Sequence, residues 1–540
     1  MNRAANLIAL QSNQFDLLVI GGGITGAGIA LDAAARGLKT ALVEKEDFAS
    51  GTSSRSTKLI HGGLRYLKQL EFALVKEVGS ERAIVHKLAP HLVVPEKMLL
   101  PLYEKRGLGY WLTSIGLKIY DWLAGVKPED QRKMLTRLQT LNHEPLLKKD
   151  DVKGGAVYAE YRTDDARLTI EIIKLASQKG ACVTNYTEVT EFVYTNNKVS
   201  GAMLVDRVTG STFSVDAKVI VNATGPWVDE LRIINQSRQG KQLHLTKGVH
   251  IVVPFHRLPV HQAIYFDVPD GRMIFAIPRG RVTYIGTTDT DYQGNKNAVL
   301  ATRDDVNYIL HAVNETFPSV LLTLADVESS WAGLRPLIHE EGKSASELSR
   351  KDEIFESPTG LISIAGGKLT GYRKMAERVV DKVIDQQFED SDLKSCTTDK
   401  MILPGGDFTE YSEVKKLEAE LAGKLGTLNQ RGNEATNLVH LYGTQSKTIV
   451  DYLEQHQTGE PEQDLVLAKA WFAVQHEMAI TPLDFINRRS GLLYFNHPKM
   501  IRNLQAVIAY FASEFNWSNE EKTKQTQIAE QALAEVIRFE

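Results

Sequence analysis

The stretch FDLLVIGGGITGAGIALDAAARGLKTALVEKEDF, residues 15–48, decides the fold of the first part of the chain. It opens with a short apolar run at 15–20, which is typical of a buried parallel strand. Three glycines follow with G-x-G-x-x-G spacing, namely Gly21, Gly23 and Gly26. Small, helix-compatible residues then occupy 27–36, and a second strand is expected at 40–43. A strand, a glycine turn and a helix in this order predict a dinucleotide-binding unit of Rossmann type.

Each glycine of this motif has its own physical task. Gly21 allows the tight turn, Gly23 lets the backbone approach a pyrophosphate, and Gly26 permits close packing of helix against strand. The helix N-terminus offers unpaired N–H groups to the phosphates. Glu44 ends the second strand 18 residues after Gly26, where it can accept hydrogen bonds from an adenosine ribose. The motif occurs once and near the N-terminus, as is common in flavoproteins, so we expect FAD and no nicotinamide cofactor.

The composition is that of a globular protein: 540 residues, of which 43% are hydrophobic and 24% charged, with a net charge of −4. This charge gives the whole molecule no electrostatic attraction to nucleic acid. Cys182 and Cys396 have no metal-ligand spacing, so we expect no metal site and a reducing cytoplasm. The start lacks a signal-peptide core, and no stretch approaches the roughly 18 apolar residues of a membrane span. We therefore expect a protein that is soluble or lies on a membrane surface.

The sequence pattern changes several times along the rest of the chain. Residues 69–150 are expected to be largely helical, and 186–216 to form a β-meander. Four strand-like runs with hairpin turns in 241–292 predict an antiparallel sheet that could cover a pocket. A strand, a Gly-Gly pair and a helix return at 361–384. The sequence ILPGGDF at 402–408 then marks the boundary of a helix-rich C-terminal region.

Several further motifs follow one another in a definite order. They are GGGITGAGIALDAAARGL, SSRSTKLIHGGLRYL, APHL, DDARL, VNATGPWV, KGVHIVVP, IGTTDTDY, GLRPL, GGKLTGYRKMAE and, at 476–491, HEMAITPLDFINRRSG. Together they resemble the FAD-dependent glycerol-3-phosphate dehydrogenases, the aerobic quinone-linked family, over nearly the whole chain. Thr25 and Gly371 depart from the residues common in that family, and neither side chain carries the chemistry of its reaction.

The resemblance implies an α/β (α+β multidomain) fold with three units. These are a Rossmann-like FAD-binding domain (1–80, 151–230 and 355–390), an antiparallel-sheet substrate-binding domain (81–150 and 231–354) and an all-α C-terminal domain (400–540). It also implies oxidation of sn-glycerol 3-phosphate to dihydroxyacetone phosphate, with electrons passing from the flavin to a membrane quinone. A homodimer at the inner face of the membrane is the corresponding expectation. The helical stretch YWLTSIGLKIYDWLAG at 110–125 is either a membrane contact or a packed core helix.

Motif and resemblance together assign the FAD-binding positions. They are Gly21, Gly22, Gly23, Ile24, Thr25, Gly26, Glu44, Lys45, Thr52, Ser53, Ser54, Ser56, Thr57, Lys58, Leu59, His61, Gly62, Gly63, Val189, Ala223, Thr224, Gly225, Gly367, Lys368, Leu369 and Thr370. The helix that starts near Leu369 can face the flavin pyrimidine, where negative charge grows on reduction.

The substrate carries a phosphate, which favours arginine because its planar fork binds two oxygens at once. By resemblance the substrate pocket contains Arg65, Tyr66, Arg335, Arg350 and Lys368, with Arg335 and Lys368 also counted as catalytic. The alternative for each cation is an ordinary place on the surface.

The reaction also needs a base for the C2 hydroxyl proton, and His250 is our choice because histidine titrates near neutral pH and lies on a strand of the expected substrate sheet. A histidine satisfied within the sheet remains the alternative. His61 and Asp289 are competing candidates, the first more suited to packing on the flavin and the second to capping a loop.

The basic residues of RSTKLIHGGLRYLK, 55–68, have helical spacing, but Gly62-Gly63 argues against a helix. We expect a non-helical segment along FAD, with Arg65 and Tyr66 reaching the substrate and Arg55 and Lys68 left on the surface.

Three other functions are compatible with parts of this pattern. A glycerol-3-phosphate oxidase would pass electrons to O₂, although the insertion typical of such oxidases is not seen between 330 and 540. A flavin amine or hydroxy-acid oxidase of the same superfamily would need one arginine for a carboxylate, not several cations. A non-catalytic FAD-binding scaffold would not need the phosphate-binding residues.

Overall fold

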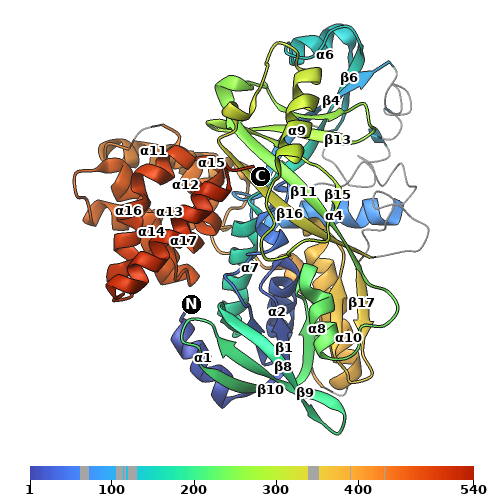
Figure 1. Ribbon diagram of the computed structural model, residues 1–540, viewed down its shortest axis with the longest axis vertical. Coiled ribbons are helices and arrows are strands. Elements are labelled where there is room, and N and C mark those ends of the chain that lie inside the picture. The colour runs from blue at the N-terminus through green and yellow to red at the C-terminus, as the bar shows by residue number, and fades with distance from the viewer. Residues whose placement is uncertain are drawn as a thin grey trace.

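The computed structural model describes residues 1–60, 72–104, 114, 117–118, 131–338, 352–389, 391–430 and 432–539. Two β-sheets and a helical domain make up this part of the chain, as Figure 1 shows. The first sheet lies at the end that holds α1, the second at the opposite end, and the helical domain, coloured orange to red, packs beside their junction.

The first sheet has a parallel centre. Its strands are β1 (Gln14–Ile20), β2 (Thr40–Val43), β7 (Cys182–Thr184), β8 (Thr187–Thr195), β9 (Lys198–Asp206), β10 (Thr212–Asn222), β17 (Glu353–Glu356) and β18 (Ile362–Ala365). The order is β17-β18-β10-β1-β2-β7, and β9 joins β10 to β8 on an antiparallel branch. The apolar run predicted at 15–20 is therefore the buried parallel strand that we expected.

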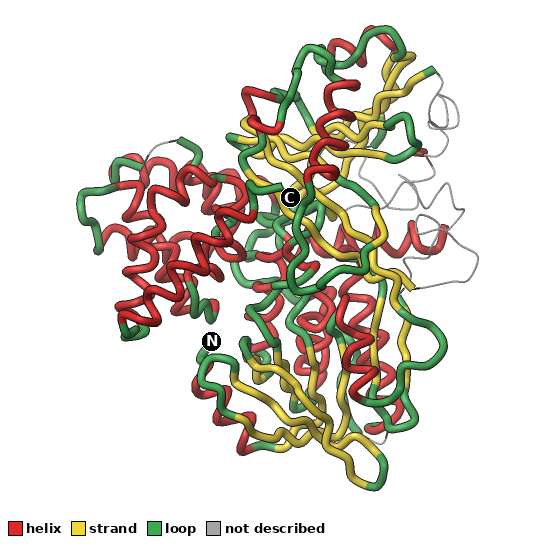
Figure 2. The backbone as a smooth tube through the Cα atoms, viewed as in Figure 1, coloured by secondary structure: helices red, strands yellow, loops and turns green. Residues whose placement is uncertain are grey.

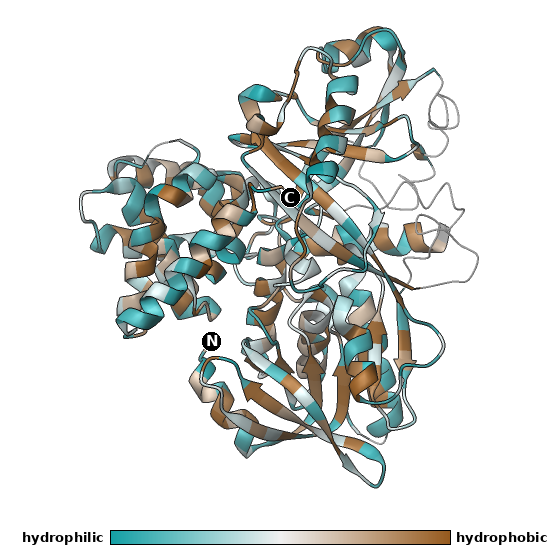
Figure 3. Cartoon of the chain, in the orientation of Figure 1, coloured by the Kyte–Doolittle hydropathy of each residue, from teal (hydrophilic) through white to brown (hydrophobic). Residues whose placement is uncertain are grey.

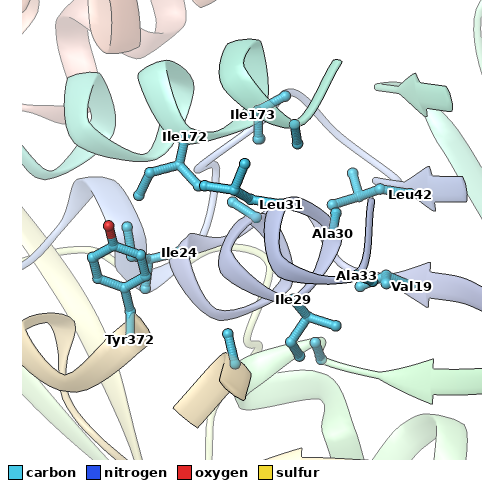
Figure 4. Close-up of a cluster of buried hydrophobic side chains, with 14 of the residues drawn as sticks. Val19, Ile24, Ile29, Ala30, Leu31, Ala33, Leu42, Ile172, Ile173 and Tyr372 are labelled. Carbon is cyan, nitrogen blue, oxygen red and sulfur yellow. The ribbon is translucent and has the colours of Figure 1, made fainter. Parts of the chain in front are cut away.

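Helices cover one face of this sheet. Because successive β1 residues point to opposite faces, they enter two different cores. Leu17 and Val19 join a core made with α2 (Ile24–Arg36), α7 (Asp165–Gln178) and α10 (Tyr372–Gln387). Figure 4 shows α2 in the middle of this core. Leu18 and Ile20 face the other side, where β8, β9 and α1 (Arg3–Ser12) close the layer.

The second sheet is mostly antiparallel. It contains β3 (Leu59–Ile60), β4 (Val94–Tyr103), β5 (Lys133–Thr136), β6 (Val152–Arg162), β11 (Leu243–Pro254), β12 (Ala263–Asp267), β13 (Met273–Arg279), β14 (Val282–Gly286), β15 (Thr290–Asp291) and β16 (Ser329–Ile338). The main order is β15-β11-β14-β13-β12-β4-β6-β3, with β16 paired to β11 and β5 to β6. The helix α9 (Arg303–Thr316) packs on one face, in the core formed by Val249, Ile251 and Ile285.

The C-terminal domain is helical throughout its described part, as the red tube in Figure 2 shows. Its helices are α11 (Tyr411–Thr427), α12 (Glu434–Tyr442), α13 (Ser446–Gln455), α14 (Pro461–Glu477), α15 (Leu492–Phe495), α16 (His497–Glu514) and α17 (Asn519–Glu535), with a π-helical turn at Asp484–Arg489. The first four helices enclose a core of their own, whereas α15, α16 and α17 share a core with Tyr284 and Trp331 of the second sheet. The strands of both sheets are among the brown, hydrophobic segments of Figure 3.

Two expectations about 69–162 are wrong. The described residues within 69–150 are not largely helical, since β4 and β5 lie between α4 (Phe72–Leu88) and α6 (Arg137–His143). Pro95 and Pro101 lie within β4, opposite Tyr161 and Gly155 of β6, so these prolines do not end the strand. Residues 152–162, expected in the first unit, belong to the second sheet because β6 pairs with β4 along its length. Conversely, Val85, Leu88 and Val93 pack in the core of the first unit.

Within the described residues, no helix is long and apolar enough to span a bilayer. The stretch at 110–125 lies almost entirely outside those residues. No group of three or more His, Cys, Asp or Glu side chains in the described part is arranged to hold a metal ion.

Candidate active site

The turn between β1 and α2 is built for a close backbone approach. Gly21 has a φ of +113°, and a Cβ there would meet the carbonyl oxygen of Ala223 at 2.7 Å. A Cβ on Gly26 would lie 1.9 Å from the carbonyl oxygen of Gly21, so only glycine fits. Gly23 begins α2 without a side-chain cap, and the N–H of Ile24 donates to Oγ of Ser53 at 2.9 Å. The turn thus keeps the open helix N-terminus that a pyrophosphate requires.

Glu44 lies at the end of β2, directly beside this turn. Its Oε2 accepts a hydrogen bond from the N–H of Gly22 at 2.7 Å, and Oε1 accepts from the N–H of Glu46 at 3.0 Å. Burial raises the pKa of Glu44 and outweighs these two backbone hydrogen bonds. The Ala223-Thr224-Gly225 turn adjoins Gly21 from the neighbouring strand β10. Lys45 lies 4.6 Å from the ring of Trp227, just after that turn.

The segment 52–60 runs from the first sheet to the second and is fixed at nearly every residue. Oγ1 of Thr52 donates to the carbonyl oxygen of Leu334 at 2.8 Å. Ser54 is buried within a short 3₁₀ turn at Thr52–Ser54. Leu59 and Ile60 pair with β6 as β3. The segment is therefore non-helical beyond residue 54, as the sequence predicted for 55–60.

A buried ion pair holds the middle of this segment. Lys58 has a φ of +56°, and its Nζ donates to Oδ1 of Asp165 at 2.5 Å and to the carbonyl oxygen of Ser54 at 3.0 Å. The other carboxylate oxygen of Asp165 accepts from the N–H and Oγ of Ser56, at 3.0 and 2.6 Å. Asp165 lies in the DDARL motif, but the sequence alone gave it no role in the site.

Three glycines on one face of the second sheet leave room for neighbouring groups that a Cβ would displace. A Cβ on Gly248 of β11 would lie 2.3 Å from Nη2 of Arg335, and one on Gly286 of β14 would lie 2.2 Å from the His250 ring. A Cβ on Gly333 of β16 would meet the carbonyl oxygen of Arg55 at 2.5 Å. The guanidinium, the imidazole and the segment 52–60 therefore all lie over the same face.

Arg335 is held in a defined orientation. Its Nη1 donates to the carbonyl oxygen of Thr288 at 3.2 Å and to Oδ1 of Asp289 at 3.0 Å, and its Nη2 donates to Oγ1 of Thr287 at 2.9 Å. Its side chain keeps 21% exposure. A guanidinium held in a fixed orientation is suited to binding an anionic ligand.

His250 is buried, with 1% of its surface exposed, and contacts the segment 52–60 directly. Its Nε2 lies 3.0 Å from Oγ1 of Thr57. Its Nδ1 has no hydrogen-bond partner within the described part of the chain. Burial, followed by the charges of Arg335 and Lys58, lowers the pKa of His250 well below its ordinary range. Burial and these two charges therefore favour the neutral form of the imidazole.

A second Gly-Gly turn joins β18 to α10. Gly366 and Gly367 have φ angles of +79° and +77°, and a Cβ on Gly367 would collide with Sδ of Met375 at 2.3 Å. Lys368 is half-buried and precedes the short turn Leu369–Gly371, in which Thr370 is buried; α10 then begins at Tyr372. This places the predicted strand, glycine turn and helix start beside β10 in the first sheet.

The remaining predicted site residues fall into two groups. Val189 is buried in the core between β8 and β1, and Thr25 is half-buried in α2. His61, Gly62, Gly63, Arg65, Tyr66 and Arg350 lie outside the described residues. The sequence gave no role to Trp331, which stacks on His250, because a single tryptophan in a strand carries no spacing signal.

Comparisons with known proteins identify the family of the chain. The model of the family "FAD dependent oxidoreductase" matches residues 16–372, and that of the "C-terminal domain of alpha-glycerophosphate oxidase" matches 396–522. Fold and site thus define an FAD-dependent oxidoreductase, which confirms the predicted cofactor. The solved glycine oxidase from Geobacillus kaustophilus, 20% identical with a TM-score of 0.52 over 72% of this chain and 99% of its own, shares the fold.

Longer and closer matches define the family more narrowly. The aerobic glycerol-3-phosphate dehydrogenase of Bacillus subtilis (strain 168) is 47% identical over 99% of this chain and 98% of its own. The enzyme of that name from Staphylococcus aureus (strain USA300) is 47% identical over 97% of this chain and 95% of its own. The glycerol-3-phosphate dehydrogenase from Bacillus halodurans, solved in complex with FAD, superposes with a TM-score of 0.84 at 45% identity, covering 99% and 97% of the two chains. The chain therefore belongs to the aerobic glycerol-3-phosphate dehydrogenase family, as the motifs predicted.

Proposed function

We propose that this protein oxidises sn-glycerol 3-phosphate to dihydroxyacetone phosphate and passes the electrons to a membrane quinone. The observation that carries this proposal is the common face of the second sheet on which Arg335, His250 and the FAD-binding segment 52–60 lie. An anion-binding group and a proton acceptor beside a flavin site are what this reaction needs.

Bound FAD supplies the acceptor for the two electrons that leave C2 of the substrate as hydride. The protein moves the remaining proton: the C2 hydroxyl gives it to a ring nitrogen of neutral His250 as the C–O bond becomes a ketone. Arg335 binds the phosphate and fixes the distance between it and C2. Lys368, at the second Gly-Gly turn, completes the cationic surroundings, and Arg65, Tyr66 and Arg350 are proposed as further substrate contacts.

Anaerobic flavin reduction tests the substrate. The purified holoenzyme is mixed with sn-glycerol 3-phosphate, and in parallel with glycerol and with a panel of phosphate-bearing and phosphate-free alcohols. We expect bleaching of the flavin band only with the phosphate-bearing substrate. Equal bleaching by glycerol would remove the phosphate requirement, and bleaching by an amino or hydroxy acid would favour the other oxidases of the superfamily.

Two variants test the residue roles. His250→Gln should lower the flavin reduction rate by about 10²–10⁴-fold, the usual contribution of a general base. A reduction rate within a few-fold of wild type at every pH would exclude His250 as the base. Arg335→Ala should raise the KM for glycerol 3-phosphate by at least about 30-fold, since losing a charged partner costs about 2 kcal/mol or more. An unchanged KM would remove Arg335 from the phosphate site.

The electron acceptor needs a separate measurement because the C-terminal model bears the name of an oxidase domain. We expect turnover with a soluble quinone analogue and little peroxide in air. Stoichiometric peroxide with no quinone reduction would establish the oxidase alternative instead.

We further propose that the protein works as a homodimer, in the cytoplasm at the inner membrane face. Light scattering checks the mass, and flotation with anionic liposomes checks the contact. A monomer in the first assay, or no flotation in the second, would contradict the corresponding part of the proposal.

A further inference from the structure

Trp331 lies at the point where the second sheet, the FAD-binding segment and the C-terminal domain meet. It is opposite His250 in the β11–β16 pair. The two rings stack with centroids 4.8 Å apart and planes inclined by 10°. The indole is only 3% exposed, and its Nε1 donates to the carbonyl oxygen of Ser56 at 3.1 Å. One side chain therefore contacts both the imidazole and the segment expected to lie along FAD.

The C-terminal domain supports the same indole. Tyr494 and Phe495 of α15 have ring centroids 5.2 and 5.7 Å from that of Trp331. Nζ of Lys58 lies 5.7 Å from the Trp331 ring and 5.9 Å from the Phe495 ring, so the cation is between aromatic faces. This helix comes from a domain to which the sequence assigned no role in the reaction.

Arg279 ties α15 to the first unit as well. Its guanidinium lies 3.8 Å from the Phe495 ring, and its Nη2 donates to Oδ2 of Asp164 at 3.0 Å. Asp164 precedes Asp165, the partner of Lys58. The aromatic residues of α15 and the charged residues around Lys58 thus form one packed group next to His250.

We propose that Trp331 is a positioning residue that holds the His250 ring and the 56–58 segment in a fixed relation, and that α15 supports it. This inference rests on the proposed role of His250 as the base. The indole packs parallel to the imidazole and so restricts the orientation of the His250 ring. Because the indole also donates to Ser56, it holds the adjacent Thr57, whose Oγ1 lies within hydrogen-bond distance of Nε2 of His250. A phenylalanine could stack but could not donate this hydrogen bond.

The stack also keeps water from one face of the imidazole. The charged groups that face His250 are Arg335 on β16 and Lys58 in the FAD-binding segment, the latter paired with Asp165. Both cations remain when Trp331 is replaced, whereas water gains access to the His250 imidazole. Opening this face should therefore move the pKa of His250 upward, toward its ordinary value.

The experiment compares Trp331→Leu, Trp331→Phe and Phe495→Leu with a matched control, Trp471→Leu. Trp471 also stacks on an aromatic ring, Tyr452, at 4.0 Å, but inside the C-terminal domain. The readouts are the anaerobic rate of flavin reduction by glycerol 3-phosphate, its KM, its pH profile and the FAD dissociation constant. The ¹H and ¹⁵N signals of the His250 ring, assigned with His250→Gln, report its environment independently of activity.

We expect Trp331→Leu to lower the reduction rate by about 100-fold, the scale for a misplaced catalytic group, with less than about a threefold change in KM. The acid limb of the pH profile should move to higher pH, and the His250 ring signals should shift because the indole ring current is lost. Trp331→Phe and Phe495→Leu should give smaller changes in the same direction, which keeps the test decisive if Trp331→Leu folds poorly. Trp471→Leu should change none of these readouts.

A double mutant separates positioning from general destabilisation. In a His250→Gln background, Trp331→Leu should have little further effect on the reduction rate, because both variants remove the same step. If the two substitutions lowered the reduction rate independently, so that their factors multiplied in the double mutant, the positioning role would be overturned. Unshifted His250 signals in both Trp331 variants would also overturn it. If glycerol 3-phosphate fails to reduce the wild-type flavin, the proposed function fails; the pH at which the His250 ring signals titrate in the Trp331 variants still decides whether the indole shields the ring.

Discussion

Asp47 and Arg489, 442 residues apart in the chain, form a fully buried two-oxygen ion pair between the first unit and the C-terminal domain. Nη1 of Arg489 donates to Oδ2 of Asp47 at 2.7 Å and Nη2 donates to Oδ1 at 2.9 Å. Arg488 also donates to Oδ2, at 2.6 Å. A second buried group nearby joins Glu477 to Arg167 and Lys174. These pairs fix the C-terminal domain, and with it α15, against the FAD-binding unit.

Asp47→Asn should destabilise the protein by about 3 kcal/mol, because it removes the carboxylate shared by two buried guanidinium groups and leaves Arg488 with Asp484 and Arg489 with the more distant Glu477. Urea unfolding followed by fluorescence measures the free energy of unfolding. The control is Glu420→Gln, which breaks an exposed ion pair to Lys447 and should change that free energy by less than about 0.5 kcal/mol. If the two substitutions lowered the free energy of unfolding equally, the buried ion pair would contribute no more to stability than the exposed one.

Acid should destabilise the protein at these same buried pairs. Burial alone would raise the pKa of Asp47 and of Glu477, but in each case the neighbouring cations outweigh it and lower the pKa to about 2. The folded-state pKa values lie below the ordinary 3.8 and 4.5, so the stabilisation is present above about pH 4.5 and is lost as the pH falls toward 2. Asp484, whose pKa is raised by burial and by Asp47, opposes this trend in part.

The measurement is the free energy of unfolding between about pH 6 and about pH 3, a window that spans the ordinary carboxyl pKa values. We expect little change above about pH 4.5 and a fall below it, shallower in Asp47→Asn because one of the contributing carboxylates is gone. A free energy independent of pH over this range would contradict the assignment.

Gly286→Ala should impair catalysis without removing the cofactor. The new Cβ would lie 2.2 Å from the His250 ring, so the imidazole must move, and a displacement of about 1 Å can lower the rate by about 100-fold. Stopped-flow flavin reduction measures the rate, and the absorbance ratio of flavin to protein measures cofactor content. Gly423→Ala in α11 is the control: nothing lies within 4 Å of its Cβ, and it should stabilise the helix by up to about 1 kcal/mol. A wild-type rate for Gly286→Ala would show that His250 does not pack tightly against Gly286.

Gly26→Ala should abolish FAD binding. A Cβ at this position would lie 1.9 Å from the backbone oxygen of Gly21, which does not yield as a flexible side chain would. The turn that receives the pyrophosphate must then open. Titration of the apoprotein with FAD, followed by flavin fluorescence, should show loss of binding, whereas Gly423→Ala binds as wild type does. Unchanged affinity would mean that the pyrophosphate does not lie at this turn.

Local patterns predicted the central elements well. The run at 15–20, the glycine turn and the second strand at 40–43 appear as β1, the start of α2 and β2, because a continuous apolar run and glycine spacing act between neighbours in the chain. The prediction of largely helical structure for 69–150 was wrong in the described residues, because β4 lies within this range and its register with β6 is not visible in the sequence.

The sequence by itself determined the glycine turn between β1 and α2 and the family, and it proposed the residues for phosphate and proton chemistry. Only the tertiary structure decided that His250 faces Thr57 and Trp331, and that Asp47 meets Arg488 and Arg489. The physical reason is range. A turn or strand is specified by interactions within a few residues, whereas these contacts depend on how two sheets and a helical domain pack, which no local periodicity records.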